Sequence, residues 1–195
     1  MIMSQLFRQS LAGLKVLIAF TIILGLAYPL LVTGIGKIIA PGRADGSSLT
    51  VHGKVVGSSL IGQSFSGRQW FTGRPSAAGD GYDAMSSGGS NLAANSPELR
   101  QTIEHRRITI AKLNGVRPDQ VPPDAVTASG SGLDPDISPA YAAIQVERVA
   151  KVRGLSATSV RDLVDEHTQG RTFGFLGEPR VNVLELNAAL VQLHR

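Results

Sequence analysis

VLIAFTIILGLAYPLLVTGIG, residues 16–36, is an uncharged and largely apolar stretch bounded by Lys15 and Lys37. As an α-helix rising ~1.5 Å per residue, it would be about as long as the hydrocarbon core of a bilayer is thick. The stretch therefore predicts a single transmembrane helix. It would follow a short N-terminal tail (residues 1–15) and precede a soluble domain (residues 43–195).

A cleaved secretory signal is the alternative interpretation of this stretch. The apolar region of such a signal is only ~7–15 residues long, and small residues follow it at the cleavage site. The nearest candidate triplet, Ile38-Ile39-Ala40, has isoleucine where a small residue is needed. We therefore expect the helix to be retained as a membrane anchor.

Glycine and proline interrupt the predicted helix at Gly25, Pro29 and Gly34. Such residues are tolerated in a membrane where neighbouring groups satisfy the loosened backbone, and small residues let helices approach closely. One helix cannot enclose a transport path by itself. We therefore expect these three residues to pack against the helices of partner subunits.

The charge of the chain is concentrated near the apolar stretch. The formal net charge is +4, and Arg8, Lys15 and Lys37 supply three of these charges with no acidic residue before position 38. The remainder is close to neutral and only 5% of the chain is aromatic, which argues against nucleic-acid binding. The absence of cysteine excludes disulfides, thiolate metal sites and a cysteine nucleophile.

Flanking charge does not set the orientation of the helix in the membrane. Arg8 and Lys15 before the apolar stretch are balanced by Lys37 and Arg43 after it. Because large domains are translocated with little regard to their charge, we expect residues 43–195 to lie outside the cytoplasmic membrane. In a Gram-negative bacterium this compartment is the periplasm.

The soluble part mixes strand and helix patterns without regular alternation. Short apolar runs in residues 47–71 predict two or three strands, and the Gly- and Ser-rich residues 72–95 predict a long loop. We expect this loop to be anchored by Trp70, Phe71, Tyr82, Met85 and Leu92.

Four helices should follow this loop, and together with the strands they predict an α+β domain. Their expected N-caps are Ser96, Ser138, Ser156 and Asn182. Helical spacing turns the following apolar side chains toward a core: Ile103, Ile110, Leu113, Ala142, Val146, Val149, Ala150, Val160, Leu163, Val164, Leu186, Leu190 and Leu193.

Motifs for nucleotide hydrolysis and serine catalysis are incomplete. No G-x-x-x-x-G-K-[ST] loop occurs, and the glycine pair in SSGGSN (residues 86–91) fits a surface turn better than an anion site. The segment Ser129-Gly130-Ser131-Gly132 does not match the G-x-S-x-G elbow, and nothing in the sequence brings Asp165 and His167 to its serines. We predict no catalytic residue.

Metal sites are not predicted either. The histidines have no zinc-binding spacing; they are His52, His105, His167 and His194. The segment Asp134-Pro135-Asp136 lacks the remaining ligands of a calcium loop and is more typical of a turn.

The sequence also allows predictions for three other polar side chains. Arg74 and Arg180, each beside a proline, should form structural ion pairs with nearby acids such as Asp80, Asp83 or Glu178. Gln145 stands next to the core-facing Val146 in the helix that Ser138 opens. We expect its amide to face solvent, with a hydrogen bond across an interface as the alternative.

Six segments together resemble one protein family. They are VGSSLIGQSF (56–65), FTGRPSA (71–77), SSGGSNL (86–92), PPDAVTASGSGLDPDISP (122–139), QVERVAKVRGL (145–155) and GEPRVNVLELNAAL (177–190). With YPLLVTGIG at the end of the apolar stretch, they are similar over nearly the whole chain to the C subunit of the bacterial Kdp potassium-transporting P-type ATPase. The segment NSPEL (95–99) departs slightly from the family's residue order.

The resemblance implies a non-catalytic accessory subunit of an inner-membrane complex. Its partners would be a channel-like subunit that takes in potassium and a P-type ATPase subunit; this chain itself has no D-K-T-G phosphorylation motif. The family implies a stabilising role in assembly and an effect on ATP affinity, with Gln145 at the position of the suggested nucleotide contact. No cofactor of its own is implied, and ATP would act through the complex.

The expected orientation conflicts with that nucleotide contact, because a domain outside the membrane does not meet cytoplasmic ATP. Our physical expectation is instead a stabilising cap over the outer entrance of the potassium path. A free-standing membrane-anchored periplasmic enzyme or binding protein is the alternative function.

Overall fold

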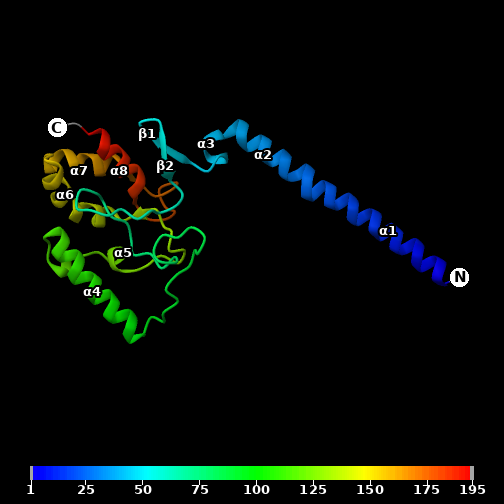
Figure 1. Ribbon diagram of the computed structural model, residues 1–195, viewed down its shortest axis with the longest axis horizontal. Helices are drawn as coiled ribbons and strands as arrows, with labels where there is room; N and C mark the ends of the chain where they lie inside the picture. The colour runs from blue at the N-terminus through cyan, green and yellow to red at the C-terminus, as the bar shows by residue number, and fades with distance from the viewer. Residues whose placement is uncertain (1, 194–195) are drawn as a thin grey trace. The chain divides into compact units, whose positions relative to one another are not determined.

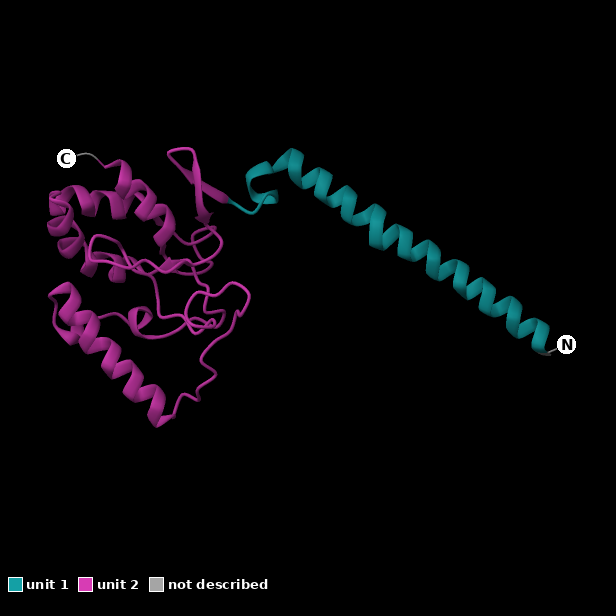
Figure 2. Cartoon of the chain, in the orientation of Figure 1, with its two compact units in different colours: residues 1–47 teal, residues 48–195 magenta. Residues whose placement is uncertain are grey.

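The computed structural model describes residues 2–193, so His194 lies outside the described residues. The chain forms two compact units, residues 1–47 and residues 48–195 (Figure 2). The division between them falls a few positions after residue 43, where the sequence predicts the soluble domain to begin.

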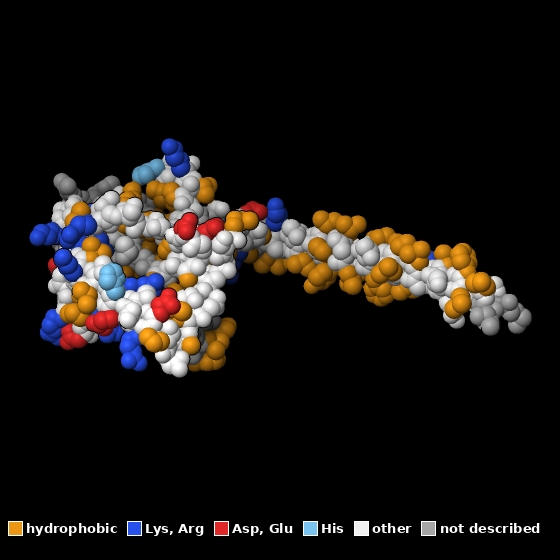
Figure 3. All heavy atoms as spheres, turned by 60° about the horizontal axis from the view of Figure 1, so that its bottom comes forward, with side chains coloured by type: hydrophobic (Ala, Val, Ile, Leu, Met, Phe, Trp, Pro, Cys, Tyr) orange, Lys and Arg blue, Asp and Glu red, His pale blue; other side chains and the backbone are white. Residues whose placement is uncertain are grey.

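The first unit consists of helices. Helix α1 (Ile2–Ile22) continues through the π-helical turn η1 (Ile23–Ala27) into α2 (Tyr28–Ile39), and the short α3 (Pro41–Ala44) follows. Residues 3–39 form one apolar helix of 37 residues, so the helix extends beyond the predicted residues 16–36 at both ends. Apolar side chains line it along its length (Figure 3). Its length and composition suit a membrane span.

Proline accounts for the π-turn. At the end of η1 the backbone N–H of Tyr28 donates to the carbonyl of Ile23, five residues earlier. Pro29 has no N–H, and in a regular α-helix its ring would collide with the carbonyl of Gly25. A π-turn directly before Pro29 relieves this collision while the helix continues in nearly the same direction.

The second unit is an α+β domain, as predicted. Strands β1 (Ser48–Val51) and β2 (Lys54–Ser58) form an antiparallel hairpin. A separate antiparallel sheet has the order β3-β5-β4, from β3 (Asp136–Ile137), β5 (Arg180–Asn182) and β4 (Thr168–Gln169). Two strands lie within residues 47–71, and residues 59–71 contain neither strand nor helix.

Six helical elements complete the domain: α4 (Pro97–Asn114), the 3₁₀ turn η2 (Pro118–Gln120), α5 (Pro123–Val126), α6 (Pro139–Arg153), α7 (Ala157–Glu166) and α8 (Val183–Gln192). All four predicted N-caps are confirmed. Each cap side chain accepts a hydrogen bond from the backbone N–H three residues on, at 2.9 to 3.4 Å; the caps are Ser96, Ser138, Ser156 and Asn182. Helices α4 and α6 end at Gly115 and Gly154, both left-handed.

The core lies among α6, α7, α8 and the inner residues of the three-stranded sheet, with α4 along the edge of the domain (Figure 1). The predicted inward residues of α6 and α7 are buried, as are Leu186 and Leu190 of α8. Phe71 is fully buried although it belongs to no helix or strand. Met85 was expected to anchor the long loop, but it is 93% exposed, so that expectation is wrong.

The long loop is held by a second loop rather than by a sheet. The N–H of Gly88 donates to Ser131 O at 2.8 Å, and Ser87 Oγ donates to the same carbonyl at 3.0 Å. Ser76 Oγ donates to Gly132 O at 2.6 Å. The SSGGSN and SGSG motifs therefore pack on each other.

Candidate functional site around Gln145

Residues 68–72, Arg-Gln-Trp-Phe-Thr, form a segment of turn and irregular backbone that we call the strap. It has no strand partner, yet a buried backbone must have its N–H and C=O groups satisfied. Side chains of α6 and α8 supply these bonds. The predicted site residue Gln145, on α6, is one of the side chains that bind the strap.

Gln145 binds the backbone of Thr72 with both ends of its amide. Its Oε1 accepts from Thr72 N at 2.8 Å and from Thr72 Oγ1 at 3.0 Å, while its Nε2 donates to Thr72 O at 3.1 Å. The side chain is fully buried, so the expectation that it faces solvent is wrong. The missed signal is its spacing, since Gln145 lies four positions from both Tyr141 and Val149, which are buried on the same face of α6.

Asn187 of α8 makes the same arrangement one residue earlier in the strap. Its Oδ1 accepts from Phe71 N and its Nδ2 donates to Phe71 O, both at 2.9 Å. The side-chain amide thus replaces the neighbouring peptide that a strand would provide. Sequence reasoning did not single out this residue, although it lies beside the core-facing Leu186.

Arg148 is a buried cation bonded to neutral oxygens. Its Nη1 donates to Trp70 O at 2.9 Å and to Arg68 O, its Nε to Asn114 Oδ1 at 2.8 Å, and its Nη2 to Gln145 Oε1 at 2.8 Å. Among the described residues no carboxylate pairs with it. Burial lowers the pKa of Arg148, and the nearby Arg68 lowers it further.

Trp70 is the partly buried aromatic side chain next to Phe71 in the strap. The guanidinium carbon of Arg153 lies 4.4 Å from the centre of its ring, and Arg153 Nε donates to Gln69 O at 2.9 Å. Phe65 packs against the same ring at 6.1 Å between centroids.

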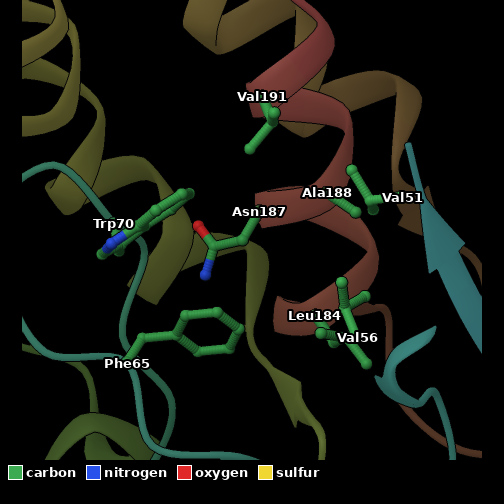
Figure 4. Close-up of a pocket in the computed structure, with 8 residues that line it drawn as sticks. All are labelled: Val51, Val56, Phe65, Trp70, Leu184, Asn187, Ala188 and Val191. Atoms are coloured by element: carbon green, nitrogen blue, oxygen red, sulfur yellow. The ribbon is translucent and has the colours of Figure 1, made fainter. Parts of the chain in front are cut away.

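An apolar cavity of about 110 Å³ borders the strap (Figure 4). It is lined by Val51, Val56, Phe65, Trp70, Leu184, Asn187, Ala188 and Val191. Pockets for small molecules usually measure ~300–1,000 Å³ and carry several convergent polar groups. This cavity is therefore unsuited to a nucleotide.

Two ion pairs connect Arg74 and Arg180 to the segment Asp134-Pro135-Asp136. Arg74 pairs with Asp134 at 2.7 Å and Arg180 with Asp136 at 3.2 Å. Structural ion pairs were predicted, but the partners named were wrong; Glu178 binds Arg171 instead. The segment Asp134-Pro135-Asp136 was expected to be a turn, but Asp136 begins strand β3. Asp134 is distant in sequence from Arg74, as Asp136 is from Arg180, and each pair forms only in the fold.

The serine and histidine motifs do not form a catalytic arrangement in the described part of the chain. His167 Nδ1 is hydrogen-bonded to Leu163 O at 2.9 Å, at the end of α7, while Ser129 and Ser131 lie 3.4 Å apart at their Oγ atoms. No group of three or more potential metal ligands was found within residues 2–193.

The helix residues predicted to pack against partners have open surroundings. A Cβ built on Gly25 would meet only Thr21 Cγ2, at 4.0 Å, and one built on Gly34 would meet nothing within 4 Å. Gly25 lies within the π-turn and Gly34 lies nine residues later in α2, so the two glycines face different sides of the helix. Larger side chains at either glycine would project into space that the described chain leaves empty.

Comparison with known proteins gives consistent matches along the chain. The model of the KdpC family, described as the c chain of K+-transporting ATPase, matches residues 10–192. The potassium-transporting ATPase KdpC subunit of Kineococcus radiotolerans is 56% identical over 188 residues, covering 96% of this chain and 95% of that protein. The KdpC subunit of Streptomyces coelicolor is 50% identical, with 95% and 93% covered, and that of Acidobacterium capsulatum is 52% identical, with 93% and 98% covered.

Proposed function

Because this chain belongs to the KdpC family of potassium-transporting ATPase subunits, we propose that it is a non-catalytic accessory subunit that stabilises assembly of an ATP-driven potassium-import complex. The observation that carries the proposal is the extent of the family match, which includes both the membrane-type helix and the domain. A free-standing anchored enzyme or binding protein would not explain that match.

The proposed partners are a channel-like potassium-binding subunit and a P-type ATPase subunit in the inner membrane. The helix supplies one means of association, through Gly25, Pro29 and Gly34. The domain supplies another, since its loops are fixed by buried side-chain clamps and so present a defined surface. We place this domain outside the cytoplasmic membrane, as a cap over the entrance of the potassium path.

An effect on ATP affinity through Gln145 is the second form that the function can take. The resemblance to the family supports it, but both polar atoms of the Gln145 amide already bind Thr72. A nucleotide would have to displace the strap and expose a side chain that is now fully buried. We therefore propose that Gln145 acts mainly as a structural clamp.

The orientation of the domain decides between these two forms. Protease added to right-side-out spheroplasts should digest residues 48–195 and leave a fragment of the membrane helix, because a domain of this size is translocated regardless of the balanced flanking charges. Immunoblots against the C-terminal part of the chain would measure the loss. Protection in spheroplasts with digestion in inverted vesicles would place Gln145 on the side of ATP and reverse the proposal.

Replacing both Gly25 and Gly34 by leucine should weaken assembly without removing the chain from the membrane. Each new side chain has free space within the chain itself, so a loss of association must come from a neighbouring helix that can no longer approach. Co-purification of the two partner subunits with the tagged chain, and potassium uptake at low external potassium, should both fall.

Gly13→Leu is the matched control, because a Cβ at Gly13 also meets nothing within 4 Å but the residue precedes the predicted span. It should leave co-purification unchanged. If the double variant assembles and transports as well as this control, the helix is a passive anchor and association depends on the domain. Failure of the unaltered chain to co-purify with either subunit would instead favour the free-standing protein.

A further inference from the structure

Residues 171–178, RTFGFLGE, form a small hairpin with an apolar tip, which we call the Phe hairpin. Phe173 is 84% exposed, Phe175 70% and Leu176 50%. Phenylalanine and leucine are normally buried in a soluble domain, and clustered exposed apolar residues mark surfaces that bind something. These three side chains take no part in the core or in the site around Gln145.

Short-range bonds fix the Phe hairpin. Thr172 and Leu176 exchange backbone hydrogen bonds in both directions at 2.9 Å, which leaves a three-residue loop at the tip. Arg171 and Glu178 close its base with an ion pair of 2.7 Å. The tip is therefore held in one shape before any partner arrives, which lowers the entropy lost on binding.

Phe173 adopts a backbone conformation that bulky residues avoid. Its φ is +54°, in the left-handed region where glycine and asparagine are favoured. Such a conformation costs about 1–3 kcal/mol and often occurs at binding sites. Glycine or asparagine would fit this backbone better but has no aromatic ring. The strained position of Phe173 therefore indicates that the exposed ring itself has a role.

The charges around the Phe hairpin favour a protein partner over a lipid surface. Arg171 is paired with Glu178, and the following Arg180 with Asp136 at 3.2 Å. Peripheral binding to anionic lipid depends on unpaired Lys and Arg beside the apolar residues, and both arginines here are paired with carboxylates. An uncharged tip with two phenylalanines suits an apolar depression on a protein.

We propose that Phe173, Phe175 and Leu176 insert into an uncharged apolar depression on a membrane-spanning subunit of the same complex. This inference rests on the proposed function, which supplies the partner. Aromatic side chains in a desolvated pocket commonly dominate the free energy of an interface. The Phe hairpin would then be the main contact that the domain, as distinct from the helix, makes with its partner.

A double variant tests the contact in the full chain co-expressed with the partner subunits. Phe173→Asn together with Phe175→Ser removes both rings, and asparagine tolerates the left-handed backbone, so the fold should be retained. We expect recovery of the partner subunits with the tagged chain to fall by about tenfold or more. Met85→Ser is the matched control, since Met85 is 93% exposed outside the Phe hairpin; it should leave recovery unchanged.

Photocrosslinking identifies the occupant directly. With p-benzoyl-phenylalanine at position 175, a crosslink to a membrane-spanning subunit supports the inference, and a crosslink only to lipid or to a second copy of the chain overturns it. Unchanged recovery of the double variant also overturns it. If the unaltered chain recovers no partner, the proposed function fails and this inference with it, so the two failures are distinguishable.

Discussion

Replacing Arg148 by methionine is expected to lower the free energy of unfolding by about 3 kcal/mol. The substitution keeps a long apolar side chain but leaves the oxygens of Asn114, Trp70 and Arg68 without their donor. An orphaned buried acceptor costs ~1–3 kcal/mol, and removal of the poorly solvated charge offsets only part of the sum. For a chain of this size the midpoint temperature should fall by roughly 6–12 °C.

Trp70 makes this measurement direct. It is the only tryptophan in the chain and belongs to the strap, so its fluorescence during denaturant unfolding of the full chain in detergent reports on this part of the domain. Arg161→Met is the control, because Arg161 forms an exposed pair with Glu147 at 3.5 Å. We expect it to change stability by less than ~1 kcal/mol. Equal midpoints for the two variants would show that Arg148 does not hold the strap.

Gly132→Ala should have a comparably large effect, for a steric reason. Gly132 has a φ of +68°, and a Cβ there would lie 2.6 Å from Gly88 O and 2.7 Å from Ala78 N. Both are backbone atoms, so the two loops must separate to admit the methyl group. We expect a loss of about 3 kcal/mol, from left-handed strain of ~1–3 kcal/mol and the disrupted loop packing.

Gly130→Ala provides the control two residues away. A Cβ on Gly130 meets nothing within 4 Å, so we expect stability to change by at most ~0.5 kcal/mol. The same unfolding titration compares the variants, and amide exchange at Gly88, whose N–H binds Ser131 O, should quicken only in Gly132→Ala. Similar behaviour of both alanine variants would contradict tight packing of the SGSG segment on the SSGGSN loop.

The local features of the fold were accessible from the sequence. An N-cap such as Ser138 and the residue it binds, Tyr141, are three positions apart, so a short segment contains the whole interaction. The same holds for the left-handed glycines that end α4 and α6. The core-facing positions of α6 to α8 follow from helical spacing, which also depends only on nearby residues.

The strap could not be predicted in this way. Thr72 and its clamp Gln145 are 73 positions apart, and Phe71 and Asn187 are 116 apart. An amide that binds a remote backbone looks in the sequence like an amide that faces water. Only the helical spacing of Gln145, which places it on the buried face of α6, distinguishes these two cases. The spacing does not identify Thr72 as the residue that Gln145 binds.

The glycines in Ser-Gly-Ser-Gly show a similar limit. Gly130 and Gly132 are equivalent in the sequence, yet a Cβ on Gly130 would meet nothing within 4 Å, whereas a Cβ on Gly132 would meet the backbones of Gly88 and Ala78. Which of them is constrained depends on residues 78 and 88, which tertiary folding brings into contact with that segment. The membrane stretch was recognised because its signal is composition and length alone.

The π-turn at Ile23–Ala27 has a consequence for how the anchor meets its surroundings. A hydrogen bond that spans five residues inserts one residue beyond the regular α-helical count, so the angular phase of the side chains after Pro29 is offset from that before it. Small residues that share one face of the helix before the π-turn therefore do not lie on the same face as those after it. The two halves of the anchor can thus contact neighbouring helices on different sides. Replacing Pro29, the residue that accounts for the π-turn, would rotate the side chains of one half relative to those of the other.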